Sequence, residues 1–249
     1  MAGHSHWAGI KHKKALIDNK RGKLWSKLSK GIIIAAKLGG GDPDANIRLR
    51  KAIDDAKAVS MPKDNIERAI KRGTGELDGG DVEEILYEGY GPGGVAVMCE
   101  IMTDNRNRTA PELRTLFAKY GGNLGGTGCV AYLFARKGLF LFPATTSEEA
   151  ITIVALENGG EDVETKEDGR CQVICSPESF SALADAFQQA KMQPEVSEVT
   201  RLPLSMSAVD LGTARSCMKL LEELDEHDDV QNVFTNLEIP REVLAELQA

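Results

Sequence analysis

The sequence has few aromatic residues, few histidines and no long hydrophobic run. Phe, Trp and Tyr make up 5% of the 249 residues, and three of the four histidines lie within the first twelve positions. The longest uncharged apolar run, residues 31–36, is far shorter than the ~20 residues of a transmembrane helix. No apolar segment precedes a cleavage site at the amino terminus, so no signal peptide is predicted. We therefore expect a cytoplasmic protein without membrane contact.

Cysteine is scarce too, and the residues that support catalysis are missing from the usual patterns. The five cysteines form no C-x-x-C pair, which favours free thiols in a reducing compartment. Nucleophilic catalysis usually needs a histidine base, but the one histidine beyond the amino terminus, His227, is surrounded by acidic residues near an expected helix end. No glycine cluster continues into the Gly-Lys-Ser/Thr of a phosphate-binding loop. The sequence predicts no enzyme, no metal site and no cofactor.

What the sequence does contain is a strong separation of charge. Residues 1–76 carry 17 Lys and Arg against 8 Asp and Glu, a net charge of +9, whereas residues 77–249 carry 13 against 30, a net charge of −17. A polyanion would be attracted to the first part and repelled by the second. This favours nucleic-acid contact through the amino-terminal third. The alternative is a solvated basic face that balances an acidic one.

The amino-terminal third is predicted to be helical after a basic arm. Residues 2–22 combine His, Trp and Lys with few apolar residues, so we expect an arm that is mobile until it binds a partner. A helix is predicted over 23–38, with lysines on one face and apolar residues on the adjacent one. A second helix is expected over 42–58, started by Asp-Pro and burying Ile47, and a third over 63–73. Together they predict a small helical bundle.

Beyond residue 80 the hydrophobic pattern alternates between strands and helices. Residues 138–200 have the order β-α-β-β-α-β of a ferredoxin-like fold, and the segments on either side form a second such order when this block is removed. The predicted strands are 83–90, 94–103, 129–135, 138–142, 161–166, 170–175, 195–200, 201–206 and 230–236, and the predicted helices are 109–120, 147–158, 177–190, 211–226 and a short one after Pro240.

The resulting fold class is α+β with several domains. An N-terminal three-helix domain is followed by two ferredoxin-like α+β domains, one inserted in the other. The predicted parts are a basic arm (1–22), a helical bundle (23–76), an α+β domain (77–136 plus 201–240), an inserted α+β domain (137–200) and a C-terminal tail (241–249).

The candidate nucleic-acid contacts are mostly basic residues of the arm and the first helix. Lysines and arginines supply charge for phosphates, and Trp7 offers a ring for stacking on an unpaired base. No helix presents an obvious set of base-edge readers, so strong duplex sequence specificity is not predicted. The predicted contacts are His4, His6, Trp7, Lys11, His12, Lys13, Lys14, Lys20, Arg21, Lys23, Lys27, Lys30, Arg106 and Arg108.

Two further segments allow both a structural and a functional interpretation. Arg106 and Arg108 are expected on the loop before a helix, where they would either make a second phosphate contact or belong to a surface loop with an Asn or Asp helix cap. The glycine-rich residues 121–128 are expected to end a helix and form a connection, with close approach to a ligand as the alternative.

Several long motifs occur together in this chain. They are AGHSHWAGIKHK at 2–13, LGGGDPDAN at 38–46, MPKDNIERAI at 61–70, YEGYGPGG at 87–94, TDNRNRT at 103–109 and GNLG at 122–125. In these motifs the chain closely resembles the YebC family, whose mitochondrial relative is the translational activator of cytochrome c oxidase. The resemblance extends over nearly the whole chain, with Cys129 where members commonly have Ser. Because it begins at residue 2, it implies the bacterial, cytoplasmic branch.

The resemblance implies three domains and a role in gene expression that is not enzymatic. It leaves two functions: a ribosome-associated translation factor that helps synthesis through difficult stretches such as proline runs, and a DNA-binding transcriptional regulator. A mobile arm, lysines and one Trp favour RNA slightly, because they suit irregular RNA better than a duplex groove. A third alternative is an adaptor whose acidic domains dock a basic partner, such as a ribosomal protein or a polymerase subunit.

Overall fold

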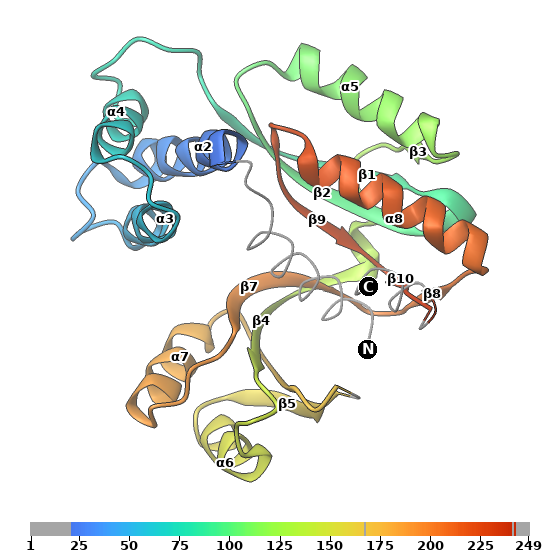
Figure 1. The fold of residues 1–249 in the computed structure, drawn as a ribbon. Helices are drawn as coiled ribbons and strands as arrows, with labels where there is room; N and C mark the ends of the chain where they lie inside the picture. Colours follow the sequence, from blue (N-terminus) through green and yellow to red (C-terminus); the bar gives the residue numbers. More distant parts are fainter. Residues whose placement is uncertain (1–20, 167, 241, 243–249) are drawn as a thin grey trace. The chain divides into compact units, whose positions relative to one another are not determined.

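The computed structural model describes residues 21–166, 168–240 and 242, and the chain divides into two compact units (Figure 1). Among the described residues, one unit contains 21–131 together with 210–233, and the other contains 132–209 together with 234–240 and 242. The predicted arm and the predicted helix after Pro240 fall outside the described residues, apart from Arg21, Gly22 and Glu242. Among the described helices, none has both the length and the apolar character needed to cross a bilayer.

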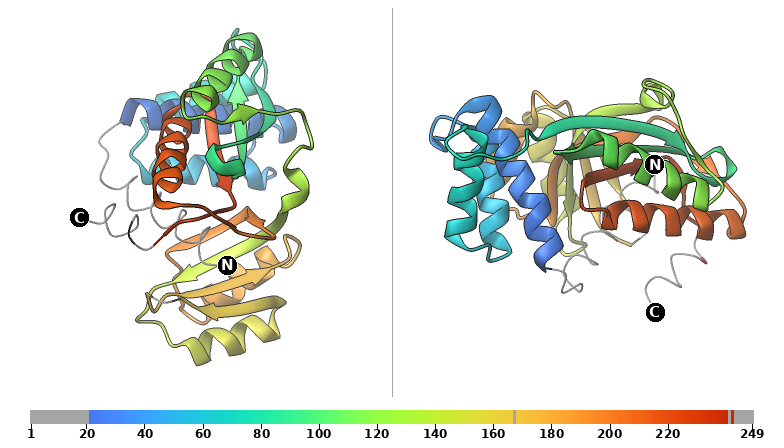
Figure 2. Two further views of the ribbon diagram at one scale, coloured as in Figure 1. Left: turned by 90° about the vertical axis from the view of Figure 1, so that its right-hand side faces the viewer. Right: turned by 90° about the horizontal axis from the view of Figure 1, so that it is seen from above.

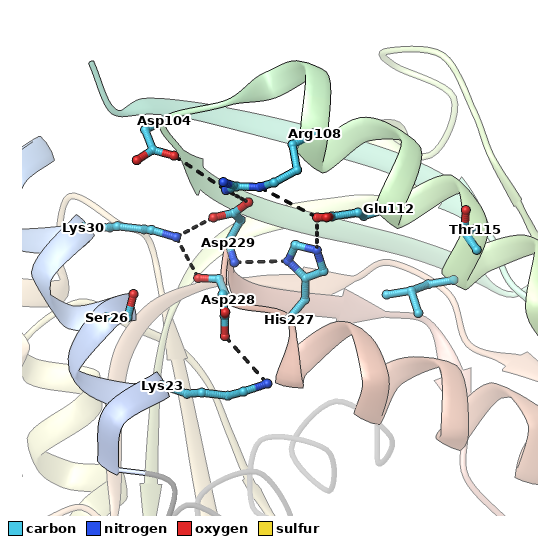
Figure 3. Close-up of a pocket in the computed structure, with 11 residues that line it drawn as sticks. Lys23, Ser26, Lys30, Asp104, Arg108, Glu112, Thr115, His227, Asp228 and Asp229 are labelled. Atoms are coloured by element: carbon cyan, nitrogen blue, oxygen red, sulfur yellow. Dashed lines mark hydrogen bonds and ion pairs between the residues drawn. The ribbon is translucent and has the colours of Figure 1, made fainter. Parts of the chain in front are cut away.

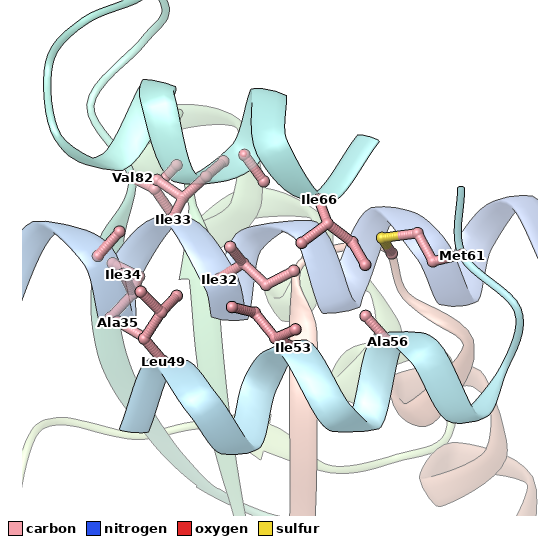
Figure 4. Close-up of a cluster of buried hydrophobic side chains, with 12 residues drawn as sticks. Ile32, Ile33, Ile34, Ala35, Leu49, Ile53, Ala56, Met61, Ile66 and Val82 are labelled. Carbon is pink, nitrogen blue, oxygen red and sulfur yellow. The ribbon is translucent and has the colours of Figure 1, made fainter. Parts of the chain in front are cut away.

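The first unit begins with the three predicted helices, α2 (Arg21–Gly39), α3 (Ile47–Ala58) and α4 (Lys63–Gly73). Their apolar faces meet in a core that Figure 4 shows between the three helices. Val82 belongs to this core and Met102 packs against it, although both lie beyond the bundle in sequence. The bundle is therefore confirmed, and its core extends into the segment that follows it.

The second helix starts later than predicted. Its N-cap is Asn46, whose Oδ1 accepts a hydrogen bond from the Leu49 backbone N at 3.0 Å, and residues 43–45 form a turn. Ile47 therefore stands at the exposed start of the helix, with 80% of its surface accessible, and the prediction that it is buried was wrong. Leu49, fully buried, takes its place in the core. The Asn46 Nδ2 also donates to Ala35 O at 2.8 Å, so one side chain joins α3 to α2.

The remainder of the first unit is a sheet with two helices on one face. The strand order is β3 (Asn123–Leu124), β1 (Glu83–Tyr90), β2 (Ala96–Thr103) and β9 (Val230–Thr235). Figure 2 shows α5 (Arg106–Lys119) and α8 (Leu211–Glu226) on the same side of this sheet. β1 and β2 pair antiparallel, with Tyr87 opposite Cys99.

This sheet departs from the predicted strand order at two places. The predicted strand 201–206 does not join this sheet. The position next to β2 that it was expected to occupy is taken by β1. The predicted strand 129–135 is wrong: residues 126–130 are irregular and turn structure, followed by a 3-10 helix (Ala131–Leu133). The buried carboxylate of Glu88 accepts hydrogen bonds from the backbone N atoms of Gly128, Val130 and Ala131 at 2.7 to 2.8 Å. These three backbone N–H groups therefore donate to a side chain, and not to the backbone of a neighbouring strand.

The second unit has the predicted β-α-β-β-α-β order. It runs β4 (Phe134–Phe142), α6 (Glu148–Glu157), β5 (Gly160–Thr165), β6 (Cys171–Cys175), α7 (Phe180–Gln189) and β7 (Val196–Pro203). The sheet order β5-β6-β4-β7, all antiparallel, is that of a ferredoxin-like fold. Phe140, Phe142 and Phe187 form its aromatic core, with ring centroids 4.7 and 5.2 Å apart. Two short strands, β8 (Ser207–Ala208) and β10 (Leu237–Glu238), pair parallel to each other.

Candidate functional site

The structure describes only some of the predicted contact residues. His4, His6, Trp7, Lys11, His12, Lys13, Lys14 and Lys20 lie outside the described residues, and Arg21 is described only as the first residue of α2. The other five, Lys23, Lys27, Lys30, Arg106 and Arg108, are placed on α2 and α5. Four of these five lie around one polar region of the first unit.

Lys23, Lys27 and Lys30 lie along one face of α2 and contact the end of α8 and the turn after it. We call them the lysine row, and residues 225–229 the acidic turn. The Lys23 Nζ donates to Glu226 O at 3.4 Å, Lys27 donates to Asp225 O, and Lys30 donates to Asp228 O at 3.0 Å. Basic side chains are favoured at this place, because the last carbonyls of a helix lack partners and carry the negative end of its dipole.

Asp229 is the buried centre of this region, with a side chain that is 1% exposed (Figure 3). One carboxylate oxygen accepts a hydrogen bond from Lys30, and the other accepts from Arg108 at 2.8 Å and from Thr109 at 2.7 Å. Burial alone would raise the pKa of Asp229, but the hydrogen bonds from Lys30, Arg108 and Thr109 outweigh burial and hold this pKa well below its usual range. The carboxylate is therefore ionised and joins α2 to α5 and β9.

Arg106 and Arg108 lie in the first turn of α5, three residues earlier than the predicted helix start. The prediction that they are on a loop was wrong, because Asn105 caps the helix by accepting from the Arg108 backbone N at 3.1 Å. The Arg108 side chain is 45% exposed, and the hydrogen bond of its guanidinium to Asp229 raises its pKa. Arg106 is exposed. A phosphate contact by either arginine stays a prediction.

His227 ends α8 and has a more defined environment than its sequence neighbours suggest. Its Nδ1 accepts the Asp229 backbone N–H at 3.1 Å, and its Nε2 lies 3.1 Å from a carboxylate oxygen of Glu112. With Nδ1 as the acceptor, the ring N–H that faces Glu112 is the one on Nε2. Since these partners are a backbone amide and a carboxylate, and neither is a Ser, Thr or Cys side chain, His227 is not arranged as the base of a nucleophile. Its spacing of 115 residues from Glu112 is why the sequence did not indicate the contact.

Glu112, His227 and Asp229 bring three possible metal-ligand atoms within 4.8 Å of one another. The surroundings do not suit a cation, however. Both oxygens of Asp229 already accept from Lys30 and Arg108, so a metal ion bound there would lie against two positive charges. We therefore assign no metal to this cluster.

A pocket of about 820 Å³ opens beside these residues. Charged groups of both signs surround it, and its most exposed cations are Lys23 and Arg108, whose side chains are 53% and 45% exposed. Its chemistry is that of hydrogen bonding and ion pairing. The lining residues are Lys23, Ser26, Lys30, Asp104, Arg108, Glu112, Thr115, Leu116, His227, Asp228 and Asp229.

Comparison with known proteins gives a consistent result over nearly the whole chain. The family model described as the TACO1/YebC protein N-terminal domain matches residues 5–76, and the model of the TACO1/YebC second and third domain matches 82–237. A protein of Rhodopirellula baltica named a probable transcriptional regulatory protein is 65% identical over 246 residues, covering 99% of this chain and 100% of the relative. A protein with the same general name from Dictyoglomus turgidum is 52% identical over 249 residues, covering 99% and 100%. The crystal structure of a conserved hypothetical protein from Aquifex aeolicus matches with a TM-score of 0.85 at 50% identity, covering 96% of this chain and 99% of that one.

Proposed function

Since the chain belongs to the TACO1/YebC family, we propose that it is a cytoplasmic, nucleic-acid-binding regulator of gene expression. Its more specific role is that of a translation factor that binds RNA at the ribosome and eases synthesis through difficult, proline-rich stretches. It acts by binding and carries no catalytic centre of its own. The names of its relatives, which describe probable transcriptional regulatory proteins, support the general part of this proposal.

The observation that carries the proposal is the separation of charge. In residues 21–73, which span the three bundle helices, thirteen Lys and Arg stand against six Asp and Glu. The residues before α2 add Lys11, Lys13, Lys14 and Lys20. A polyanion is therefore attracted to one end of the sequence, while the acidic remainder disfavours extensive coating of the protein by nucleic acid.

The arrangement of α3 supports RNA over the major groove of duplex DNA. Its exposed cations bind their own chain: Arg48 pairs with Glu84 at 2.8 Å, Arg50 donates to Pro43 O at 3.0 Å, and Lys51 pairs with Asp55 at 3.4 Å. A recognition helix needs side chains directed at base edges. Cations without that arrangement suit phosphates and unpaired bases, which RNA offers in irregular regions.

The test is a competition between purified ribosomes and duplex promoter DNA for the labelled protein in one buffer near physiological salt. We expect ribosomes to win, and a variant lacking residues 2–22 to lose them. A variant lacking residues 243–249, which contain no Lys or Arg, is the matched truncation and should bind normally. Ribosome binding that is unchanged by removal of residues 2–22 and by nuclease treatment would contradict the proposal and favour the adaptor function.

Transcriptional regulation through DNA is the second candidate, and the names of the relatives favour it. The same competition separates the two. If a specific duplex displaces ribosomes, and each lost phosphate contact weakens binding to that duplex with a salt slope reduced by ~0.9, DNA is the target. The preference for RNA would then be wrong, while the role as a nucleic-acid-binding regulator would stand.

A further inference from the structure

The lysine row holds three of the five basic residues of α2, yet it contacts the protein's own acidic turn. From this arrangement we infer that Lys23 and Lys27 are phosphate-binding residues and that residues 225–229 compete for them within the chain. The partner is the backbone of single-stranded RNA. The inference rests on the proposed function, because it assigns part of the RNA-binding surface and a contact that limits access to it.

The acceptors in the acidic turn are those that a phosphate can replace. Lys23 and Lys27 bind the backbone oxygens of Glu226 and Asp225, which are neutral acceptors. A carboxylate oxygen of Asp228, whose side chain is 60% exposed, lies 3.7 Å from the Lys23 Nζ. A phosphate oxygen carries charge and forms a stronger hydrogen bond with an ammonium group than a neutral carbonyl does. Exchange of these partners is therefore favourable when RNA is present.

The two ends of the row differ in burial, with the partly buried Lys27 between them, and this difference decides that Lys30 does not exchange. The Lys23 side chain is 53% exposed, whereas the Lys30 side chain is 14% exposed and pairs with the buried Asp229. Exposed ion pairs contribute little, but a buried charge that loses its partner is costly. Lys30 therefore keeps its place while the amino-terminal end of α2 exchanges partners.

The position of Lys23 and Lys27 in the sequence also fits binding to an RNA strand. Lys23 and Lys27 are four residues apart, about 6 Å along the helix axis. They directly follow Lys20 and Arg21, which complete the basic segment before them. In the sequence, the row thus continues the positive charge of the predicted arm into the bundle.

The first test measures how binding of labelled oligouridine to the full chain depends on salt. In Lys23→Gln/Lys27→Gln, the magnitude of the slope of log K against log salt should fall by about 1.4, since each contact to single-stranded nucleic acid contributes ~0.7. The matched control is Lys51→Gln/Lys57→Gln on α3, where both lysines pair with acids of their own helix. It removes the same charge and should leave the slope unchanged.

The second test removes charge from the competitor. Asp228→Asn should strengthen oligouridine binding by up to about five-fold, which is the range of an exposed ion pair. Asp78→Asn, at an exposed position before the first sheet, makes the same change in net charge and should have a smaller effect. A cooperative urea transition in every variant, with a loss of less than about 1 kcal/mol, establishes that the fold is retained.

Two results would overturn the inference, and they differ in what they say of the proposed function. If removal of residues 2–22 abolishes binding but the Lys23/Lys27 variant keeps the full slope, the row is not used and the proposed function stands. If the unaltered chain binds neither oligouridine nor ribosomes, both the inference and the proposed function fail.

Discussion

Asp229 holds three elements together with a single carboxylate, so its loss should weaken the first unit. In Asp229→Asn, Lys30 would lose the charge that compensates it inside the protein, and we expect a loss of about 3 kcal/mol, typical of a broken buried ion pair. Urea denaturation followed by fluorescence measures this. A Trp7→Phe background leaves Trp25 of α2 as the reporter, because the chain has two Trp residues.

Asp228, the exposed neighbour of Asp229, and the pH dependence of stability supply the controls for the effect of Asp229→Asn. Asp228→Asn should cost less than about 1 kcal/mol, as exposed pairs do. Because the pKa of Asp229 is lowered in the folded protein, its contribution is complete above the pKa of an unfolded Asp and is lost as the pH falls toward the folded value. The difference between the parent and Asp229→Asn should therefore be full at neutral pH and shrink below about pH 4. A difference that grows in acid would contradict this assignment.

Glu88 is the second residue whose polar contacts shape the backbone. Its carboxylate, 2% exposed, is the acceptor for the amides of Gly128, Val130 and Ala131. In Glu88→Gln, one oxygen becomes an NH₂ group that faces donors, and we expect a loss of about 1 to 3 kcal/mol. Hydrogen exchange should accelerate at these three amides.

Glu84 is the matched control for Glu88, because it lies on the same strand with a side chain 43% exposed. Glu84→Gln removes one surface ion pair and should change stability by less than about 1 kcal/mol. Equal effects of the two substitutions would mean that the Glu88 contacts do not hold the segment 126–131.

At the scale of elements, periodicity predicted the helices and strands well and their ends less well. The bundle helices, both α+β helix pairs and the β-α-β-β-α-β block all follow from the spacing of apolar residues. The observed boundaries differ from the predicted ones where a side-chain oxygen accepts a hydrogen bond from the backbone. These side chains are Asn46 at α3, Asn105 at α5 and Glu88 at residues 128–131. Such hydrogen bonds do not alter hydrophobic periodicity, so the pattern could not reveal them.

The candidate site was predictable in its charges but not in its partners. The lysines of α2 follow from a helical projection of the sequence. Their acceptors lie about two hundred positions away, as the separation of 199 residues between Lys30 and Asp229 illustrates. Local patterns carry no information on such a pairing, which only the packing of α2 beside α8 and β9 creates.

Two glycines of the bundle should respond to the same substitution in opposite directions. A Cβ at Gly73 would lie 2.5 Å from Ile33 O and 2.7 Å from the Cβ of Ala36, so α4 would have to move away from α2. We expect Gly73→Ala to cost about 1 to 3 kcal/mol. A Cβ at Gly31, inside α2, meets nothing within 4 Å, and Gly31→Ala should stabilise the helix by up to about 1 kcal/mol. Urea midpoints that shift in the same direction would contradict the close approach of α4.

At the scale of the whole molecule, the chain is organised by charge and by an insertion. Residues 132–209 form the main part of the second unit, between the two segments of the first. The ends of its sheet lie beside each other, since Phe134 pairs with Pro203. An inserted domain with adjacent ends leaves the surrounding sheet free to form from segments far apart in sequence. This supports the predicted insertion as a proposal about the domain boundaries.

The connection between the bundle and the first sheet allows a test of how far the bundle is independent. Residues 74–81 are exposed, but Val82 enters the bundle core and Lys30 binds Asp229 beyond it. If a site for a sequence-specific protease is inserted between Leu77 and Asp78, we expect the two pieces to stay together after cleavage. Gel filtration without denaturant measures this.

The same nicked protein with Asp229→Asn should separate more readily, because the buried ion pair with Lys30 is lost. The apolar contacts around Val82 and Met102 and the exposed ion pairs of Lys23, Lys37, Arg48 and Arg72 then join the pieces. Apolar contacts do not weaken with salt, whereas exposed ion pairs such as that of Lys23 with Asp228 do. Dissociation of the nicked Asp229→Asn variant should thus increase with ionic strength, because these exposed ion pairs are screened. Immediate separation of the unsubstituted pieces would instead mean that the bundle is an independent domain, joined to the sheet only by residues 74–81.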